Sequence, residues 1–169
     1  MKSPGAWAVI WVVASVGIFV SAFLAAKHRR AMLVGRAAVG LLFVVGGATF
    51  NALTLATGGH YKDFADASYI PFVHHTWRSV VAPHETLFIT LLIVFELGIG
   101  LLAISGRRRT QVALVGAIAF SLGLMTFAWV YYAFAVPMIV AYGLLLRAER
   151  TSASHVGKSD MLIETRRAA

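Results

Sequence analysis

The sequence predicts an all-α, polytopic membrane protein with five transmembrane helices. These are an N-terminal helix and a four-helix bundle, with an interfacial helix in an outer loop. Hydrophobic residues make up 59% of the 169-residue chain, and the mean hydropathy is +0.78; both exceed the usual values for a soluble domain. Long segments also lack charge, since residues 5–26 contain none and residues 87–105 contain one. A helix needs about 20 apolar residues to cross roughly 30 Å of hydrocarbon.

The first predicted span covers about residues 5–26, and we expect it to be retained rather than cleaved as a signal peptide. Its apolar run exceeds the about 7–15 residues of a signal peptide, and its positive charges follow the run instead of preceding it. The second span covers about residues 31–56. Four glycines along the second span favour close packing against a neighbouring helix.

Residues 57–85 form the one long polar connection, and they are too polar to cross lipid. We therefore predict an outer loop at the membrane surface. Within it, residues 72–81 carry apolar side chains at helical spacing and are bracketed by Pro71 and Pro83. This pattern favours a short interfacial helix.

The third span covers about residues 86–105 and ends at three arginines. Residues 110–146 are largely apolar and would be about 55 Å long as a single helix, nearly twice the thickness of the hydrocarbon. We therefore predict two spans, 110–128 and 131–146, with interfacial aromatic residues at the turn between them. Together, residues 1–147 form one transmembrane domain, and residues 148–169 form a polar tail that we expect to be disordered.

The distribution of basic residues predicts an outside N-terminus and a cytoplasmic C-terminus, according to the positive-inside rule. Twelve basic residues then lie on the cytoplasmic side: Lys27, Arg29, Arg30, Arg36, Arg107, Arg108, Arg109, Arg147, Arg150, Lys158, Arg166 and Arg167. Only three lie outside: Lys2, Lys62 and Arg78. Joining the last two spans into one would send the basic tail outside, which the same rule disfavours.

The net charge of +8 does not indicate a nucleic-acid partner, because the basic residues form short clusters at the ends of apolar segments. The chain has no cysteine, which excludes disulfides, thiolate-ligated zinc and cysteine-bound iron–sulfur clusters. No predicted span contains a histidine, so haem ligation within the bilayer is not expected either. The partners that we expect are the lipid bilayer and other membrane or membrane-associated proteins.

Three short motifs resemble the DoxX-like family of small bacterial integral membrane proteins. They are GRAAVGLLFVVGGATF at residues 35–50, YKDFA at residues 61–65 and FELGIGLLAISGRRRT at residues 95–110. The resemblance extends by architecture over roughly residues 31–146. The first helix is additional to the family's four-helix unit, and the long histidine-bearing loop departs from the family's compact form. A sterol-isomerase-like bundle is a competing family, but the spans contain no second acid to support it.

The resemblance implies a location in the bacterial plasma membrane and an accessory role. The family takes its name from a subunit of a thiosulfate:quinone oxidoreductase, and some members associate with redox and detoxification proteins. A quinone is therefore the cofactor that the resemblance suggests. We expect no covalent haem and no independent catalytic activity.

Glu96 is the residue with the strongest functional signal, because it lies near the middle of a predicted span. An ionised acid at that depth costs about 3 kcal/mol or more, so it must be paired, protonated or solvated by a cavity. Two interpretations stay open: a proton carrier beside a bound molecule, and a neutral acid hydrogen-bonded to Asn51, Thr90 or a backbone carbonyl. Asn51 itself is expected to form a hydrogen bond between helices.

Aromatic side chains near the outer side could line the mouth of a binding site around Glu96. The predicted ligand-binding residues are Glu96, Asn51, Phe50, Trp77, Trp129 and Tyr132. The outer loop also holds His60, His74, His75 and His84, which are weak candidates for metal ligands because their spacing matches no compact metal motif. A solvated or interfacial role explains these histidines more simply, and we predict no metal site.

The leading functional hypothesis is an accessory or anchor protein, associated with a redox or quinone-linked complex, that binds a quinone-like or lipid-like molecule near Glu96. Two alternatives stay open. The first is a small proton-coupled transporter or permeability protein. The second is a structural subunit that only packs helices.

Overall fold

The computed structural model describes the backbone of residues 4–168 and the side chains of residues 5 and 7–151. Within this part of the chain every regular element is helical, which confirms the all-α prediction. In chain order, the elements are α1 (Pro4–Leu24), α2 (Arg29–Leu41), the π-helix η1 (Leu42–Thr49), α3 (Phe50–Ala56), α4 (Pro71–Thr76), the π-helix η2 (Trp77–Val81), the 3₁₀ helix η3 (Ala82–His84), α5 (Glu85–Ser105), α6 (Arg107–Leu124), the 3₁₀ helix η4 (Trp129–Tyr131) and α7 (Tyr132–Ala168).

Four helical stretches are long and apolar enough to cross a membrane. They cover residues 7–24, 29–56, 71–105 and 129–151. α6 begins with three arginines and is the shortest of the five long helical runs. Its apolar part from Thr110 is about 22 Å long at 1.5 Å per residue.

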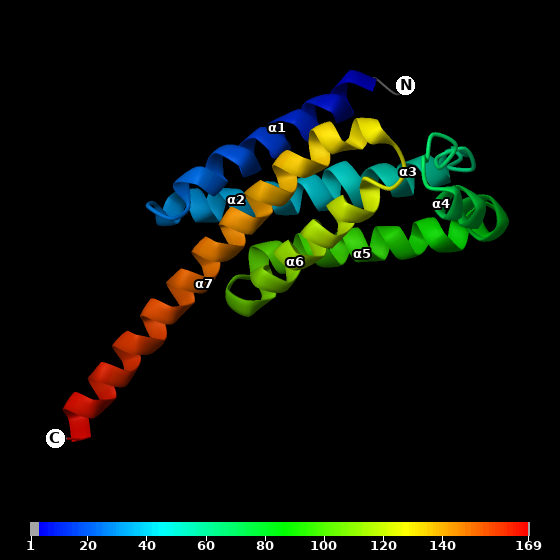
Figure 1. Ribbon diagram of the computed structural model, residues 1–169. Helices are drawn as coiled ribbons and strands as arrows, with labels where there is room; N and C mark the ends of the chain where they lie inside the picture. The colour runs from blue at the N-terminus through cyan, green and yellow to red at the C-terminus, as the bar shows by residue number, and fades with distance from the viewer. Residues whose placement is uncertain (1–3, 169) are drawn as a thin grey trace.

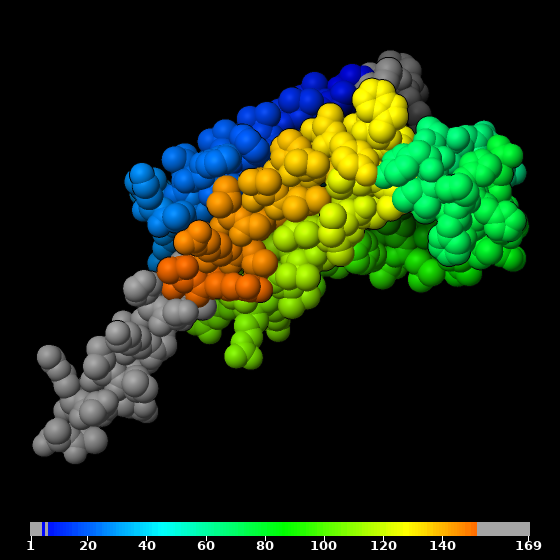
Figure 2. Space-filling view, in the orientation of Figure 1, coloured from blue at the N-terminus to red at the C-terminus, as the bar shows by residue number. Residues whose placement is uncertain are grey.

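The long helices run side by side, and α7 extends beyond the others (Figure 1). The turn between α1 and α2 and the turn between α5 and α6 lie at one end of the bundle. We call this the arginine end, because Arg29 and Arg30 begin α2 and Arg107 to Arg109 begin α6, directly after these turns. The opposite end, which we call the loop end, holds the start of α1 and residues 57–84, which are massed over it in the surface view (Figure 2).

The core of the bundle is formed by small and apolar residues from α1, α2, η1, α5, α6 and α7. Ile18, Val39, Leu114, Tyr142 and Leu145 are all at most 2% exposed. By contrast, one side of α1 is exposed along most of its length: Val9, Val12, Val13, Val16 and Phe23. Exposed apolar side chains on a helix of this length are typical of a lipid-facing surface.

Glycine permits a close approach between α5 and the continuous helical stretch formed by α2, η1 and α3. A Cβ atom added to Gly100 would lie 2.4 Å from the Val44 side chain and 3.2 Å from the Gly40 carbonyl oxygen. Any larger residue at position 100 would therefore force these helices apart. Small residues at such positions are a common device for packing membrane helices.

Two segments differ from the sequence expectation. The predicted outer helix begins at Pro71, but it does not end before Pro83 and continues through η2 and η3 into α5. Pro83 lies in the first turn of the short η3 helix, where the N–H that proline lacks is not needed. α7 continues to Ala168 and so includes residues 148–168, where the polar composition favoured disorder. The segment 132–168 contains no proline after Pro137 to interrupt the helix.

Arg36 of α2 forms an ion pair with Glu149 of α7. Its guanidinium group contacts both carboxylate oxygens of Glu149, with Nη2 donating to Oε2 over 2.5 Å. Arg36 is 17% exposed and Glu149 is 3% exposed. This pair joins α2 to α7 near the arginine end of the bundle.

Candidate functional site

Glu96 lies in the middle of α5 and is 3% exposed. Its carboxyl group lies directly against the backbone of η1 at Gly47. A Cβ atom added to Gly47 would be 2.6 Å from Glu96 Oε1 and 2.7 Å from its Cδ. Glycine at position 47 therefore provides the space that the acid occupies.

η1 differs from the α-helical segments on either side of it, because it is a π-helix of eight residues. Its Gly46 carbonyl oxygen accepts a hydrogen bond from Trp11 Nε1 of α1, at 2.9 Å. π-Helical stretches inside longer helices are frequent at functional sites. Here the stretch brings Gly46 to α1 and Gly47 to α5.

The Glu96 carboxyl group is the inner end of a chain of hydrogen bonds that leads to the loop end. Asn51 Nδ2 donates to Glu96 Oε2 over 2.8 Å, so of the three partners expected from the sequence, the structure uses Asn51. The Tyr61 hydroxyl donates to Asn51 Oδ1 over 2.6 Å. The amide of Asn51 thus connects a buried acid to a phenol of the loop.

Tyr61 is fixed at this position through its own backbone. Its N–H donates to Glu85 Oε1 over 2.5 Å, and its carbonyl oxygen accepts from Trp77 Nε1 over 3.0 Å. Phe64 lies nearby and packs its ring against Trp77 and Phe127, with centroids 5.4 and 4.9 Å away. The loop is therefore anchored both by polar contacts and by an aromatic cluster.

The electrostatic environment of Tyr61 favours its neutral form. Burial raises the pKa of the Tyr61 phenol above its ordinary value of 10. The hydroxyl of Thr54 offsets part of this rise, whereas the carboxylates of Glu96 and Glu85 add to it. The phenol therefore remains a hydrogen-bond donor to Asn51 at neutral pH.

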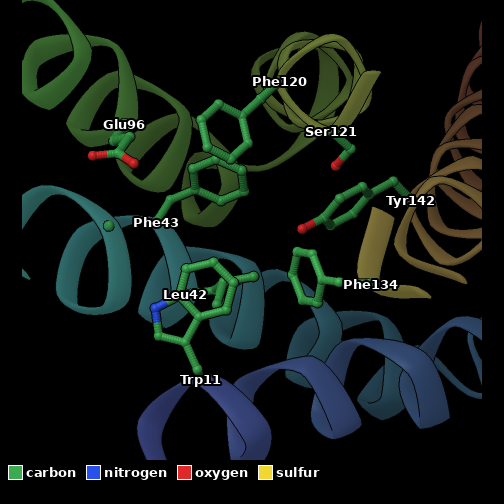
Figure 3. Close-up of a pocket in the computed structure, with 9 residues that line it drawn as sticks. Trp11, Leu42, Phe43, Glu96, Phe120, Ser121, Phe134 and Tyr142 are labelled. Atoms are coloured by element: carbon green, nitrogen blue, oxygen red, sulfur yellow. The ribbon is translucent and has the colours of Figure 1, made fainter. Parts of the chain in front are cut away.

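Two spaces lie on either side of this chain. The inner cavity is small, about 10 Å³, and Glu96, Ser121 and Tyr142 border it together with the aromatic rings of Trp11, Phe43, Phe120 and Phe134 (Figure 3). The outer cavity is open, about 590 Å³, and lies beside residues 58–62 and 82–87. The outer cavity is lined on the polar side by His60, Lys62, His84 and Glu85.

The structure brings together only some of the ligand-binding residues that the sequence predicts. Glu96 and Asn51 are joined by a hydrogen bond. Trp77 donates a hydrogen bond to the carbonyl oxygen of Tyr61, whose hydroxyl contacts Asn51. The other three lie elsewhere. Phe50 packs against Trp7, Tyr132 shares a hydrogen bond with Tyr69, and Trp129 is 79% exposed.

Sequence reasoning did not single out Tyr61, Ser121 or Tyr142 as site residues. Tyr61 belongs to the YKDFA motif, which was a usable signal. Ser121 and Tyr142 lie in apolar helices where a single hydroxyl does not stand out. Their importance depends on helix rotation, which a sequence pattern does not specify.

Two of the outer histidines lie beside different carboxylates. His60 Nδ1 is 3.6 Å from Glu85 Oε2, and His74 Nε2 is 3.8 Å from Asp66 Oδ1. Asp66 also accepts hydrogen bonds from Arg78, at 3.0 to 3.2 Å. Among the described residues, no three histidine, aspartate or glutamate side chains are grouped so that they could hold a metal ion.

Comparison with known proteins gives no independent assignment, since no family model, curated protein or solved structure matches this chain.

Proposed function

We propose that this chain is a small accessory protein of the bacterial plasma membrane that binds a quinone-like or lipid-like molecule beside Glu96. The observation that carries the proposal is the buried carboxyl group of Glu96, which Asn51 holds against the backbone of Gly47. An intramembrane acid fixed in this way is expensive to maintain and is characteristic of functional sites in membrane proteins.

The surroundings of Glu96 favour an amphipathic ligand. Five aromatic rings and two hydroxyl groups share the inner cavity with the acid. Ligand sites typically combine mostly apolar walls with a few polar groups that fix orientation. The cavity volume of about 10 Å³ admits no ring, so binding requires aromatic side chains such as Phe134 or Trp11 to move.

The orientation that we propose has five spans, the loop end outside and the arginine end in the cytoplasm. It is supported by the concentration of basic residues in the α1–α2 and α5–α6 turns at the arginine end. The resemblance to DoxX-like proteins supports an association with a redox or quinone-linked membrane complex. The exposed apolar surfaces of α1 and α5 are available to lipid or to such a partner.

The experiment compares the parent with Glu96→Gln after purification in mild detergent, with bound lipids and quinones extracted and quantified by mass spectrometry. The exchange keeps size and removes the ionisable proton. We expect the content of one amphiphile to fall at least fivefold. Asp63→Asn is the matched control, because Asp63 is exposed in the loop, and it should leave that content unchanged. Equal content in the parent and Glu96→Gln would contradict the proposal, and a protein that retains no specific molecule would favour the structural subunit.

A proton-coupled transporter is the second candidate, and the hydrogen-bond chain from Glu96 to the loop favours it. The chain gives the acid a polar connection toward the outer cavity. The test is proton flux into vesicles reconstituted with the parent or with Glu96→Gln. Flux that depends on Glu96 would favour transport, whereas flux equal to that of empty vesicles would exclude it.

A further inference from the structure

Tyr142 carries a buried polar group that the packing of the bundle does not use. The side chain lies in α7 and is 1% exposed. Its hydroxyl makes no hydrogen bond to any of the described residues, although its ring packs against Phe43 with centroids 6.5 Å apart. Because the hydroxyl borders the inner cavity and has no partner among the described residues, it is available to donate to an acceptor from outside the chain.

The Tyr142 hydroxyl points into the inner cavity, toward the space between the aromatic rings (Figure 3). Ser121 of α6 faces the same space. Its Oγ donates to the Ala117 carbonyl oxygen over 2.9 Å, so its lone pairs remain able to accept. A donor and an acceptor from two helices therefore meet at one side of the cavity.

Glu96 borders the same cavity from α5. Asn51 occupies its Oε2, whereas Oε1 makes no hydrogen bond to any of the described residues. In Figure 3 the rings of Phe43 and Phe120 appear between the acid and the two hydroxyls. These rings pack edge to face, with centroids 5.5 Å apart.

We propose that Tyr142 and Ser121 form a second hydrogen-bonding end of the Glu96 site, and that this end binds an oxygen atom. In the resting protein the occupant is a water molecule, because the cavity volume of about 10 Å³ is close to the minimum that a water requires. When the amphiphile binds, one of its carbonyl or hydroxyl oxygens replaces this water and accepts a hydrogen bond from Tyr142. The inference rests on the proposed function and adds that the ligand carries two separate oxygen-containing groups, one for Glu96 and one for Tyr142 and Ser121.

Trp11 provides the reporter for the test, because its ring borders the cavity. The other three tryptophans are replaced in the full chain by Trp7→Phe, Trp77→Phe and Trp129→Phe. This single-tryptophan protein, in lipid nanodiscs, is titrated with decylubiquinone while the quenching of Trp11 fluorescence is recorded. Decylbenzene, which lacks the ring oxygens, is the matched probe.

We expect Tyr142→Phe to weaken decylubiquinone binding about five- to tenfold, as loss of one hydrogen bond predicts. Binding of decylbenzene should change less than twofold. Tyr131→Phe, at the loop end, is the control for a lost phenol hydroxyl and should bind as the parent does. The melting temperature of ligand-free Tyr142→Phe should not fall, because the fold does not use this hydroxyl.

The possible failures are distinguishable. Undiminished decylubiquinone binding by Tyr142→Phe, together with weakened binding by Glu96→Gln, would overturn this inference and leave the proposed function standing. Equal weakening for both probes would also overturn it, because the effect would then be steric. Absence of decylubiquinone binding by the parent, or full binding by Glu96→Gln, would overturn the proposed quinone site and this inference with it.

Discussion

The carboxyl group of Glu96 occupies the space that a side chain at Gly47 would need. Its Oε1, Cδ and Oε2 atoms lie 2.6, 2.7 and 3.1 Å from the place of a Cβ atom at that position. Because Asn51 holds the same carboxyl group, the acid has little freedom to move away. The glycine and the acid therefore form one unit, although they belong to different helices.

We expect Gly47→Ala to lower the free energy of unfolding by about 1–3 kcal/mol, the usual cost of inserting a methyl group into a packed interior. The measurement is the melting temperature in a fixed detergent. Gly98→Ala is the control, because nothing lies within 4 Å of a Cβ atom at that position in α5. Equal melting temperatures for Gly47→Ala and the parent would show that the carboxyl group moves freely.

We expect the ion pair between Arg36 and Glu149 to require the forked guanidinium group. Arg36→Lys cannot contact both carboxylate oxygens in the same way, so the free energy of unfolding should fall by about 1–3 kcal/mol. Glu149→Gln should cost a similar amount, because it leaves the arginine without its counter-charge. Arg30→Lys is the control, because Arg30 is exposed at the same end of the bundle. Its melting temperature should lie within about one or two degrees of the parent's, because exposed substitutions usually have small effects. A stable Arg36→Lys would contradict a role for the two-point contact.

We expect Tyr61 to make stability depend on alkaline pH. Because burial raises the pKa of Tyr61 in the folded protein, the unfolded chain loses this proton first as the pH rises. The contribution of Tyr61 is therefore fully present below about pH 10 and decreases above it. Melting temperatures between pH 7 and pH 11 should fall less steeply for Tyr61→Phe than for the parent. Tyr131→Phe should keep the parent's slope, and identical slopes for all three proteins would contradict the assignment.

The absence of cysteine makes the proposed orientation directly testable, because an introduced cysteine is the only thiol in the chain. Asp63→Cys lies in the loop and His28→Cys lies in the turn between α1 and α2; both positions are exposed. A membrane-impermeant maleimide should label Asp63→Cys in intact cells. His28→Cys should react only after the membrane is permeabilised. The reverse pattern would invert the orientation, and labelling of both would place the two ends on the same side.

The helices themselves could be predicted from the sequence because their signal is local. The long apolar runs of α1 and α5 are properties of consecutive residues, and their lengths relate directly to the thickness of a bilayer. Glu96 also stood out without a structure, because a single acid in an apolar run is unusual. Asn51 was one of three partners expected for it.

The rest of the site depends on which helix faces meet. Tyr142 joins the inner cavity through the rotation of α7, and Tyr61 reaches Asn51 because Glu85 and Trp77 fix the loop. The ion pair between Arg36 and Glu149 depends on the same packing of helices, since the two residues are 113 positions apart in the chain.

The sequence by itself determined that this protein is helical, that several helices can cross a membrane, and that one of them carries an isolated acid. Only the tertiary structure decided that this acid lies against Gly47, that a loop tyrosine is connected to it, and that the Tyr142 hydroxyl faces the same cavity. The physical reason is that apolar length and charge are summed along consecutive residues. Contacts between helices depend on rotation, on a π-helical stretch and on the close approach that single glycines allow.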